Sequence, residues 1–376
     1  MGLVSLFMDI SSEMIHGLLP VFLMTTLGAG AMALGLIEGL AEAVAALLKI
    51  VSGGLSDKLA RRKPLLVMGY GLGAFAKPLF ALATAASGVL AARLIDRVGK
   101  GMRGAPRDAL IADIVAPPRR GAAYGLRQAL DTVGAFIGPL AAMGLMLLWQ
   151  DDVRAVLRVA ILPGLLAVLV LVVLVREPRR APPKSRAAPV DWRAWRRLGR
   201  PFWRVLGLAS MVAFARLSDA FLILAALHAG LADAFSPLVL VVMNVVFAAL
   251  SYPVGALSDR VGRKGLMALG LVMLIAAALS LAAAHSLPLV LLGVCLWGLH
   301  MGLTQGLFAA MVADSAAPPQ RGLAFGLFHG VTALALLAGN LAAGALWQFW
   351  SPGAVWLLSA LIAGVALVGL TARKFF

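Results

Sequence analysis

Four polar side chains recur at helical spacing near the start of the chain, within sequence that is otherwise apolar. They are Asp9, Ser12, Glu13 and His16, at positions i, i+3, i+4 and i+7. A helix would place all four on one face. Because an apolar setting favours the protonated form of a carboxylate, this acidic stripe could take up and release protons, with Glu13 the first candidate and Asp9 the second. The alternative is that one acid only pairs with a neighbouring helix to fix its packing.

A second set of charged residues has the same spacing but is mostly basic. It consists of Arg93, Asp96, Arg97, Lys100, Arg103 and Arg107. On a helix these residues project within about a third of the circumference. Facing the acidic stripe, this basic stripe would form ion pairs such as Glu13 with Arg97. The candidates for contact with a substrate in this half of the chain are His16, Arg93, Arg97 and Lys100.

Further carboxylates lie between these two stripes and after them. Glu38 and Glu42 share a helical face, and we expect a structural ion pair between Glu42 and Lys77. Asp131 follows Arg127 by one helical turn and could be neutralised by it. Glu38, Glu42 and Asp131 are therefore additional candidates for a proton-binding role.

The elements that position these side chains are predicted to be membrane spans. The hydrophobic fraction is 61% and the mean hydropathy is +0.94, whereas a water-soluble globule is about half apolar. A span needs roughly 20 apolar residues. We expect twelve spans, at 2–24, 32–54, 65–86, 88–110, 121–147, 153–175, 201–226, 236–256, 266–285, 287–313, 322–346 and 353–373. A charge at the membrane centre costs about 2.5–3.5 kcal/mol, so each charged residue in a span is a functional candidate.

The net charge of +16 is placed in a way that indicates membrane topology. Basic residues fall at alternate span junctions, whereas no Lys or Arg occurs in the loops at 25–31, 86–88, 228–236, 284–288 and 347–353. Positive loops mark the cytoplasmic side, so both termini are expected in the cytoplasm, with the protein in a bacterial-type inner (plasma) membrane. A nucleic-acid binder would instead need one continuous basic surface with stacking aromatics. We therefore expect no nucleic-acid partner.

Enzymatic chemistry has no support in the sequence. The single cysteine, Cys295, lies in a predicted span, which excludes an intramolecular disulfide and a cysteine metal cluster. The chain contains no Walker loop, zinc-type histidine cluster or nucleophile elbow. We predict neither an enzyme nor a metal site, and no cofactor; ATP hydrolysis is then not available as an energy source.

The chain is internally duplicated. Residues 53–63 (GGLSDKLARRK) resemble residues 255–264 (GALSDRVGRK), 202 positions later. Asp113, followed by APPRRG, likewise matches Asp314, followed by APPQRG, 201 positions later. Parallel repeats with nearly the same offset are a transporter architecture. The fold class predicted is an all-α membrane protein with two parallel-repeat six-helix bundles, 1–175 and 201–376, joined by a cytoplasmic linker at 176–200 that is rich in proline and positive charge.

The duplicated loop phrase resembles the signature of the major facilitator superfamily. The first copy departs from the usual pattern at Ala60, where the second copy has Gly262. The resemblance covers the whole chain and implies alternating access, in which the two halves rock about a central cavity. It also implies a lock at the cytoplasmic gate. The lock would consist of Asp57, Lys58, Arg61, Arg62 and Asp113 in the first half, and of Asp259, Arg260, Arg263 and Asp314 in the second.

The fifth span carries a second resemblance. Gly125, Gly134, Gly138 and Pro139 have the spacing of an antiporter signature found among proton-driven exporters, although its terminal glycine pair is replaced by Ala142 and Met143. Glycines allow helices to approach closely, and proline kinks a helix. The resemblance favours export over import.

The second half is poorer in charge than the first, so we expect proton coupling in the first half and substrate contacts in both. Its substrate candidates are Arg216, Asp219, Asn244, His300, Gln305 and His329.

The sequence predicts a monomeric secondary active transporter in the lipid bilayer, driven by the proton gradient. Antiport that exports a small, partly hydrophobic organic molecule is favoured. The alternative is a proton-coupled uptake symporter for an organic anion such as a siderophore or metabolite. A non-transporting receptor or a lipid-moving protein on the same fold is the third possibility.

Overall fold

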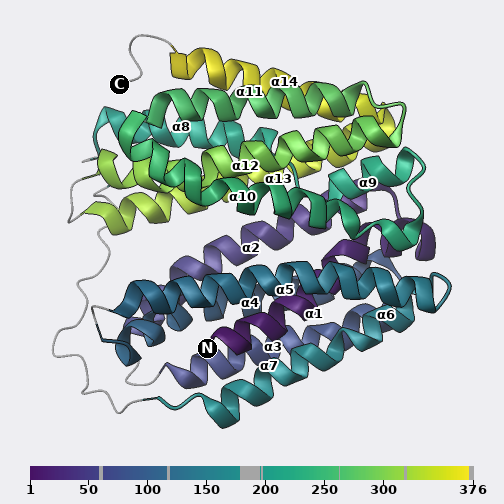
Figure 1. Ribbon diagram of the computed structural model, residues 1–376, viewed down its shortest axis with the longest axis vertical. Helices are drawn as coiled ribbons and strands as arrows, with labels where there is room; N and C mark the ends of the chain where they lie inside the picture. The colour runs from purple at the N-terminus through teal and green to yellow at the C-terminus, as the bar shows by residue number, and fades with distance from the viewer. Residues whose placement is uncertain are drawn as a thin grey trace. The chain divides into compact units, whose positions relative to one another are not determined.

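The computed structural model describes residues 1–58, 62–116, 119–177, 195, 198–261, 263–316 and 320–371. Every regular element in these ranges is a helix (Figure 1). The first half contains α1 (Gly2–Val21), the π-helix η1 (Phe22–Thr26), α2 (Ala31–Lys58), α3 (Lys63–Leu82), α4 (Ala86–Ile114), α5 (Arg120–Leu148), α6 (Val153–Val159) and α7 (Ile161–Leu174). The second half contains α8 (Arg200–Ala215), α9 (Ala220–His228), the 3-10 helix η4 (Asp233–Phe235), α10 (Leu238–Val261), α11 (Arg263–Ala282), α12 (Leu287–Ser315), α13 (Arg321–Phe349) and α14 (Pro352–Thr371).

The helices fit the predicted membrane spans. In the described part of the chain, 11 helical segments are long and apolar enough to cross a membrane. The α6 and α7 helices together form one of them, and α8 and α9 form another. The α4 helix is not among the 11, although it has 29 residues, because the basic stripe lowers its hydropathy. With α4 added, the prediction of an all-α membrane protein with twelve spans is confirmed.

The chain forms two compact units. Unit 1 comprises Met1–Ala29, Leu40–Pro189 and Asp233–Leu238, and unit 2 comprises Gly30–Gly39, Val190–Ala232 and Val239–Phe376. Two short segments, 30–39 and 233–238, belong to a different unit from the residues on either side of them in the chain. Close helix contacts explain this exchange: a Cβ atom on Gly344 would lie 2.8 Å from the backbone oxygen of Ala31, and one on Gly17 would lie 2.9 Å from Cβ of Pro237. Most of the predicted linker, 176–200, lies outside the described residues.

In unit 1, α1 packs against α5 and α7, while α3 packs against α4. An apolar cluster fills the space between α1, α3, α4 and α7; it includes Val4, Met8, Leu66, Tyr70, Leu110 and Leu171. The α3–α4 contact is close because glycines face each other: a Cβ atom on Gly99 would lie 2.9 Å from the backbone nitrogen of Gly73. This packing holds the polar faces of α1 and α4 within one unit.

In unit 2, α11 packs against α12 and α14, and α8 packs against α13. Its apolar core includes Phe202, Leu206, Met267, Leu271, Leu307 and Met311. The span formed by α8 and α9 is interrupted at residues 216–219, where Arg216 has φ −84° and ψ 85°. An interruption inside a span frees backbone groups that other polar atoms must satisfy, so it marks a place to look for polar side chains.

Candidate functional site

The acidic stripe lies on α1 as predicted, and its side chains are only partly covered. Glu13 retains 26% and His16 retains 16% of their side-chain exposure, and His16 Nδ1 lies 3.6 Å from Glu13 Oε2. Asp9 has intermediate burial. Charged groups are rarely placed in an apolar interior without a partner or access to water. These three groups on the polar face of α1 are therefore only partly covered by the rest of the described structure.

The glycines of α5 lie directly against this stripe. A Cβ atom on Gly134 would lie 3.0 Å from Cβ of Asp9, and one on Gly138 would lie 2.8 Å from Cβ of Glu13. The helices approach this closely because glycine has no side chain. Gly134 and Gly138, two of the glycines in the antiporter-type spacing, therefore form the part of α5 that packs against Asp9 and Glu13. A Cβ atom on Gly125, by contrast, would meet open space within the described part of the chain, and Pro139 lies inside α5 next to Gly138.

The basic stripe of α4 lies in the same unit. Arg93 is 2% exposed and Arg97 is 5% exposed, whereas Lys100 is exposed. Arg97 Nη2 lies 3.5 Å from Oε1 of Glu42 on α2. Arg97 thus pairs with Glu42, whereas the expected ion pair between Glu13 and Arg97 stays a prediction.

Lys77 has a different partner from the one expected. Its Nζ lies 2.9 Å from Asp96 Oδ1 and donates to Ser12 Oγ at 2.9 Å. The Lys77 and Asp96 side chains are 1% and 4% exposed. The predicted Glu42–Lys77 pair is wrong, because the glycine contact between α3 and α4 turns Lys77 toward α4 rather than α2. One member of the predicted acidic stripe, Ser12, thereby becomes part of a buried ion-pair site.

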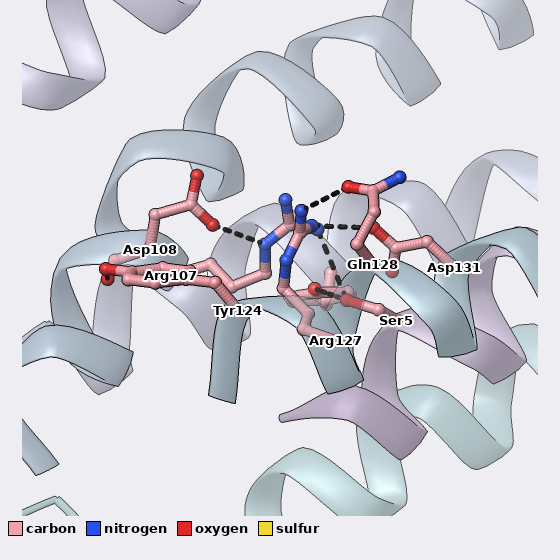
Figure 2. A network of polar contacts seen from close by, with 8 residues as sticks. Ser5, Arg107, Asp108, Tyr124, Arg127, Gln128 and Asp131 are labelled. Atoms are coloured by element: carbon pink, nitrogen blue, oxygen red, sulfur yellow. Dashed lines mark hydrogen bonds and ion pairs between the residues drawn. The ribbon is translucent and has the colours of Figure 1, made fainter. Parts of the chain in front are cut away.

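A second polar network links α1, α4 and α5 nearer the start of α1 (Figure 2). Arg107 donates to Asp108 Oδ1 at 3.1 Å and to Ser5 Oγ at 3.2 Å. Tyr124 donates its hydroxyl to the backbone oxygen of Asp108 at 2.6 Å. Ser5, Asp108 and Tyr124 were not among the predicted site residues, because single polar residues near the end of a span carry no periodic signal.

Asp131 belongs to the same region and is paired as expected. Arg127 Nη1 lies 2.6 Å from Asp131 Oδ2, and Arg127 Nη2 lies 2.8 Å from Gln128 Oε1. The i, i+4 spacing on one helix face accounts for the ion pair. The pair is mostly covered, with side-chain exposures of 13% and 15%.

In each unit an arginine of the duplicated loop signature pairs with the aspartate of the second repeat. Arg62 Nε lies 3.0 Å from Asp113 Oδ2 in unit 1, and Arg263 pairs with Asp314 in unit 2. Asp314 matches Asp113 at the offset of 201, but the loop phrase has an offset of 202 and aligns Arg263 with Arg61 and Arg62 with Lys264, so the two pairs use neighbouring and not equivalent arginines of the phrase. Arg61 lies outside the described residues, and the side chains of Asp57, Lys58, Asp259 and Arg260 lie outside the described part of the structure, so their roles in a gate stay predictions.

Glu177 makes a contact that was not predicted from the sequence. Its carboxylate accepts from the backbone N–H groups of Arg62 and Lys63, the latter at 3.2 Å. Both groups lie at the start of α3, where backbone donors have no helical partner and a negative charge is stabilised. The segment that follows α7 is thereby hydrogen-bonded to the start of α3.

In unit 2 a polar cluster gathers at the interruption between α8 and α9. Ser218 Oγ donates to Glu38 Oε2 at 3.0 Å, and the backbone N–H of Ser218 donates to Asn340 Oδ1 at 2.8 Å. Ser359 Oγ donates to the backbone oxygen of Ala215 at 2.8 Å. Glu38 is 1% exposed and Asn340 is fully buried. The first part of α2 thus places Glu38 in unit 2, whereas Glu42 belongs to unit 1.

The remaining candidates of the second half occupy varied environments. Arg216 and Asp219 are half-buried beside the interruption, and Asn244 is half-buried on α10. His300 is fully buried on α12, with Nδ1 2.8 Å from the backbone oxygen of Gly270. Gln305 is exposed on α12, and the His329 ring stacks on Phe325 with centroids 6.2 Å apart. A common substrate-binding role for these residues stays a prediction.

Comparison with known proteins agrees with this architecture. The family model of the Major Facilitator Superfamily matches residues 1–238 and 209–376. An uncharacterized MFS-type transporter of Methanocaldococcus jannaschii is 30% identical over 370 residues, which cover 96% of this chain and 91% of that protein. An uncharacterized protein of Mycobacterium tuberculosis is 29% identical over 333 residues, covering 87% and 80% of the two chains.

Solved structures with the same fold share little sequence with this chain. The nucleoside transporter NupG superposes with a TM-score of 0.81 at 15% identity, covering 100% of this chain and 98% of NupG. A POT family transporter gives a TM-score of 0.77 at 11% identity, covering 98% and 93%. The family match over both halves, the homologue and the helical spans lead to one conclusion: this chain is a multi-pass membrane transporter, not an enzyme, and belongs to the Major Facilitator Superfamily.

Proposed function

We propose that this protein is a secondary active transporter that exports a small, partly hydrophobic organic molecule in exchange for protons. Transport proceeds by alternating access, and the proton gradient supplies the energy without a cofactor. The protein works as a monomer in a bacterial-type inner membrane, with both termini in the cytoplasm. The observation that carries this proposal is the contact between the acids of α1 and the glycines of α5.

The acids of α1 support proton coupling because they are partly accessible and surrounded by charges. Asp9 and Glu13 lie on one face, within a unit that also holds Arg97 and Lys100. A carboxylate in such a place changes its protonation state when its neighbours or its access to water change. A conformational cycle that alters either one would therefore couple to proton uptake and release.

The α5 glycines support exchange rather than co-transport. A Cβ atom on Gly134 would touch Cβ of Asp9, and one on Gly138 would touch Cβ of Glu13. Any movement of α5 along α1 therefore changes the surroundings of both acids. The resemblance of these glycines to an exporter signature is thus matched by their position beside the candidate proton carriers. Export as the direction of transport rests on this combination.

A second function is supported by a different feature. Arg93, Arg97 and Lys100 bring three positive charges to one face of α4, and a substrate carboxylate or phosphate would be attracted to them. Uptake of an organic anion such as a siderophore or metabolite, in symport with protons, is therefore the alternative.

One experiment separates the two functions. A thermal-shift screen of the purified protein against metabolites, siderophores and drugs first identifies a ligand, and proteoliposomes are then loaded with either an acidic or an alkaline lumen. An antiporter accumulates ligand in vesicles with an acidic lumen, because outward proton flow drives ligand inward. A symporter accumulates it in vesicles with an alkaline lumen. Equal uptake under both gradients, and after a protonophore collapses them, would refute proton coupling.

A further inference from the structure

A cavity of about 170 Å³ lies at one end of unit 2, where α9, α11, α13 and α14 come together. Its lining includes Leu281 and Ala282 at the end of α11 and Gly353 at the start of α14. Arg263, which pairs with Asp314 in the signature loop, is the first residue of α11. The cavity is therefore at the opposite end of α11 from the signature loop, beside the connections to α12 and α14 (Figure 1).

Small residues leave this space open. Ala225 on α9, Ala282 on α11 and Ala284 in the following turn contribute little side-chain volume to it. A Cβ atom on Gly353 would lie 3.3 Å from the backbone oxygen of Ala282, so the start of α14 lies close to the end of α11. Protein interiors are normally packed with few voids larger than a water molecule. A space of this size is therefore a candidate binding site.

Two tryptophans form flat walls of the cavity. Trp356 on α14 is 1% exposed, and its ring lies edge-to-face on that of the buried Trp297, with centroids 5.9 Å apart. Trp347 on α13 is half-buried, and its ring contacts that of His228 at 6.1 Å and that of Phe221 at 6.2 Å. Edge-to-face contacts are favourable for aromatic rings. Because neighbouring rings already hold both walls, a ligand would lose little affinity to ordering them.

Two exposed histidines, His228 and His285, also line the cavity. Within the described part of the chain, neither imidazole makes a hydrogen bond or an ion pair. A neutral imidazole has one N–H donor and one acceptor nitrogen, so both rings are available to a polar group of a ligand. The residues that line the cavity include no Lys, Arg, Asp or Glu, so it offers no permanent charge to an ionic ligand.

The size and the lining define the kind of ligand. A cavity of about 150 Å³ with apolar walls holds one benzene molecule, whereas drug-sized ligands occupy about 300–1,000 Å³. One aromatic ring with a small substituent therefore fits the volume. The flat tryptophan walls suit a planar ring, and the histidines suit a substituent that both donates and accepts a hydrogen bond.

We propose that this cavity binds a small, neutral aromatic molecule with a hydroxyl group, of the phenol class. The ring lies between Trp347 and Trp356, and the hydroxyl group bonds to His228 or His285. The site is separate from the acids of α1 and from the basic stripe of α4, which belong to unit 1. It does not depend on the direction of transport or on proton coupling.

The test measures binding of 4-fluorophenol to the purified full-length protein in lipid nanodiscs, by the broadening of its fluorine NMR signal. Empty nanodiscs are the reference, because phenols also partition into lipid. We expect broadening that exceeds this reference and saturates as unlabelled phenol is added in competition.

A pair of variants in one turn tests the location. Ala284→Leu places a larger side chain at a half-buried position in the cavity lining and should weaken binding about tenfold or more, because ligand and side chain then compete for one space. Ala283→Leu makes the same change at the exposed neighbouring position, which does not line the cavity, and should bind as the wild type does.

A second probe tests the histidines. Fluorobenzene has the same ring but no hydroxyl group. The His228→Leu, His285→Leu double variant should weaken binding of 4-fluorophenol about 2–10-fold, the effect of one hydrogen bond, and leave binding of fluorobenzene unchanged. Equal weakening of both probes would refute the hydrogen bond.

Broadening equal to that of empty nanodiscs, or equal in Ala284→Leu and the wild type, would overturn the proposal. Binding that occurs in detergent micelles and disappears in nanodiscs would also overturn it, because a lipid chain would then fill the cavity. If Ala284→Leu fails to fold, Trp347→Ala replaces it: loss of one wall should weaken binding of both probes, and unchanged binding would count against the site.

Discussion

Removal of one member of the Lys77–Asp96 pair should destabilise unit 1 strongly and unequally. The two side chains are 1% and 4% exposed, and loss of one partner from a buried ion pair costs about 3–5 kcal/mol. Asp96 is also attracted by Arg97, Arg103 and Arg93. In Lys77→Met it keeps these partners, so the cost should lie near the lower end of that range.

Asp96→Asn should be the more damaging change. It leaves the Lys77 ammonium facing Arg103 and Arg93, which repel it, so the cost should lie near the upper end, about 5 kcal/mol. The Lys77→Met, Asp96→Leu double variant removes both charges and should recover most of the loss, since a buried pair replaced by apolar groups is often neutral.

The assay is reversible unfolding of the purified protein in mixed micelles, followed by circular dichroism and analysed as a double-mutant cycle. Ser12→Ala is the mild comparison, because it removes one hydrogen bond to Lys77 and should cost about 1.5–3 kcal/mol or less. Equal free energies of unfolding for both single variants and the wild type would refute the assignment of this pair as buried and structural. A larger loss for Lys77→Met than for Asp96→Asn would refute the charge argument.

Three further predictions concern the α1–α5 contact, the repeat and the interrupted span. Gly134→Ala should cost about 1–3 kcal/mol of stability, because its Cβ would lie 2.8 Å from the backbone oxygen of Leu6, whereas Gly144→Ala, with open space around it, should be neutral in the same thermal melts. Asp113→Asn and Asp314→Asn should each change stability by less than about 1 kcal/mol, because the pairs are partly exposed, yet lower the rate of ligand counterflow; wild-type rates in both would remove the gate assignment. Asn340→Leu should cost about 1–3 kcal/mol by removing the acceptor for the partly buried N–H of Ser218, while Asn244→Leu serves as the comparison. Equal melting of the two variants would count against the polar cluster in unit 2.

Much of the fold was predictable because hydrophobic periodicity and duplication are long-range signals. Twelve runs of about 20 apolar residues define the spans, and the two repeats contain the arginines and aspartates that pair in each unit, although Arg62 and Arg263 are neighbouring and not equivalent positions of the loop phrase. The sequence pattern also indicated that the α5 glycines permit a close helix contact, but it did not identify α1 as the partner helix.

The partners of individual charges were harder to predict. Lys77 pairs with Asp96 rather than Glu42, because the rotation of α3 about its axis depends on glycine contacts with α4 that no periodicity reveals. Glu38 joins unit 2 for a similar reason: the first residues of α2 pack on α13, which lies far along the chain. Glu177 was assigned to the linker, although its carboxylate holds the start of α3.

Exchange of protons for an organic ligand can be followed through the proton movement that the ligand itself causes. Proteoliposomes with a pH-sensitive dye in the lumen, and no initial pH difference, receive ligand on the outside. We expect the lumen to become more alkaline as ligand enters and protons leave, and we expect Asp9→Asn to abolish this change while ligand counterflow continues. An unchanged luminal pH during measurable ligand entry into wild-type vesicles would contradict proton exchange.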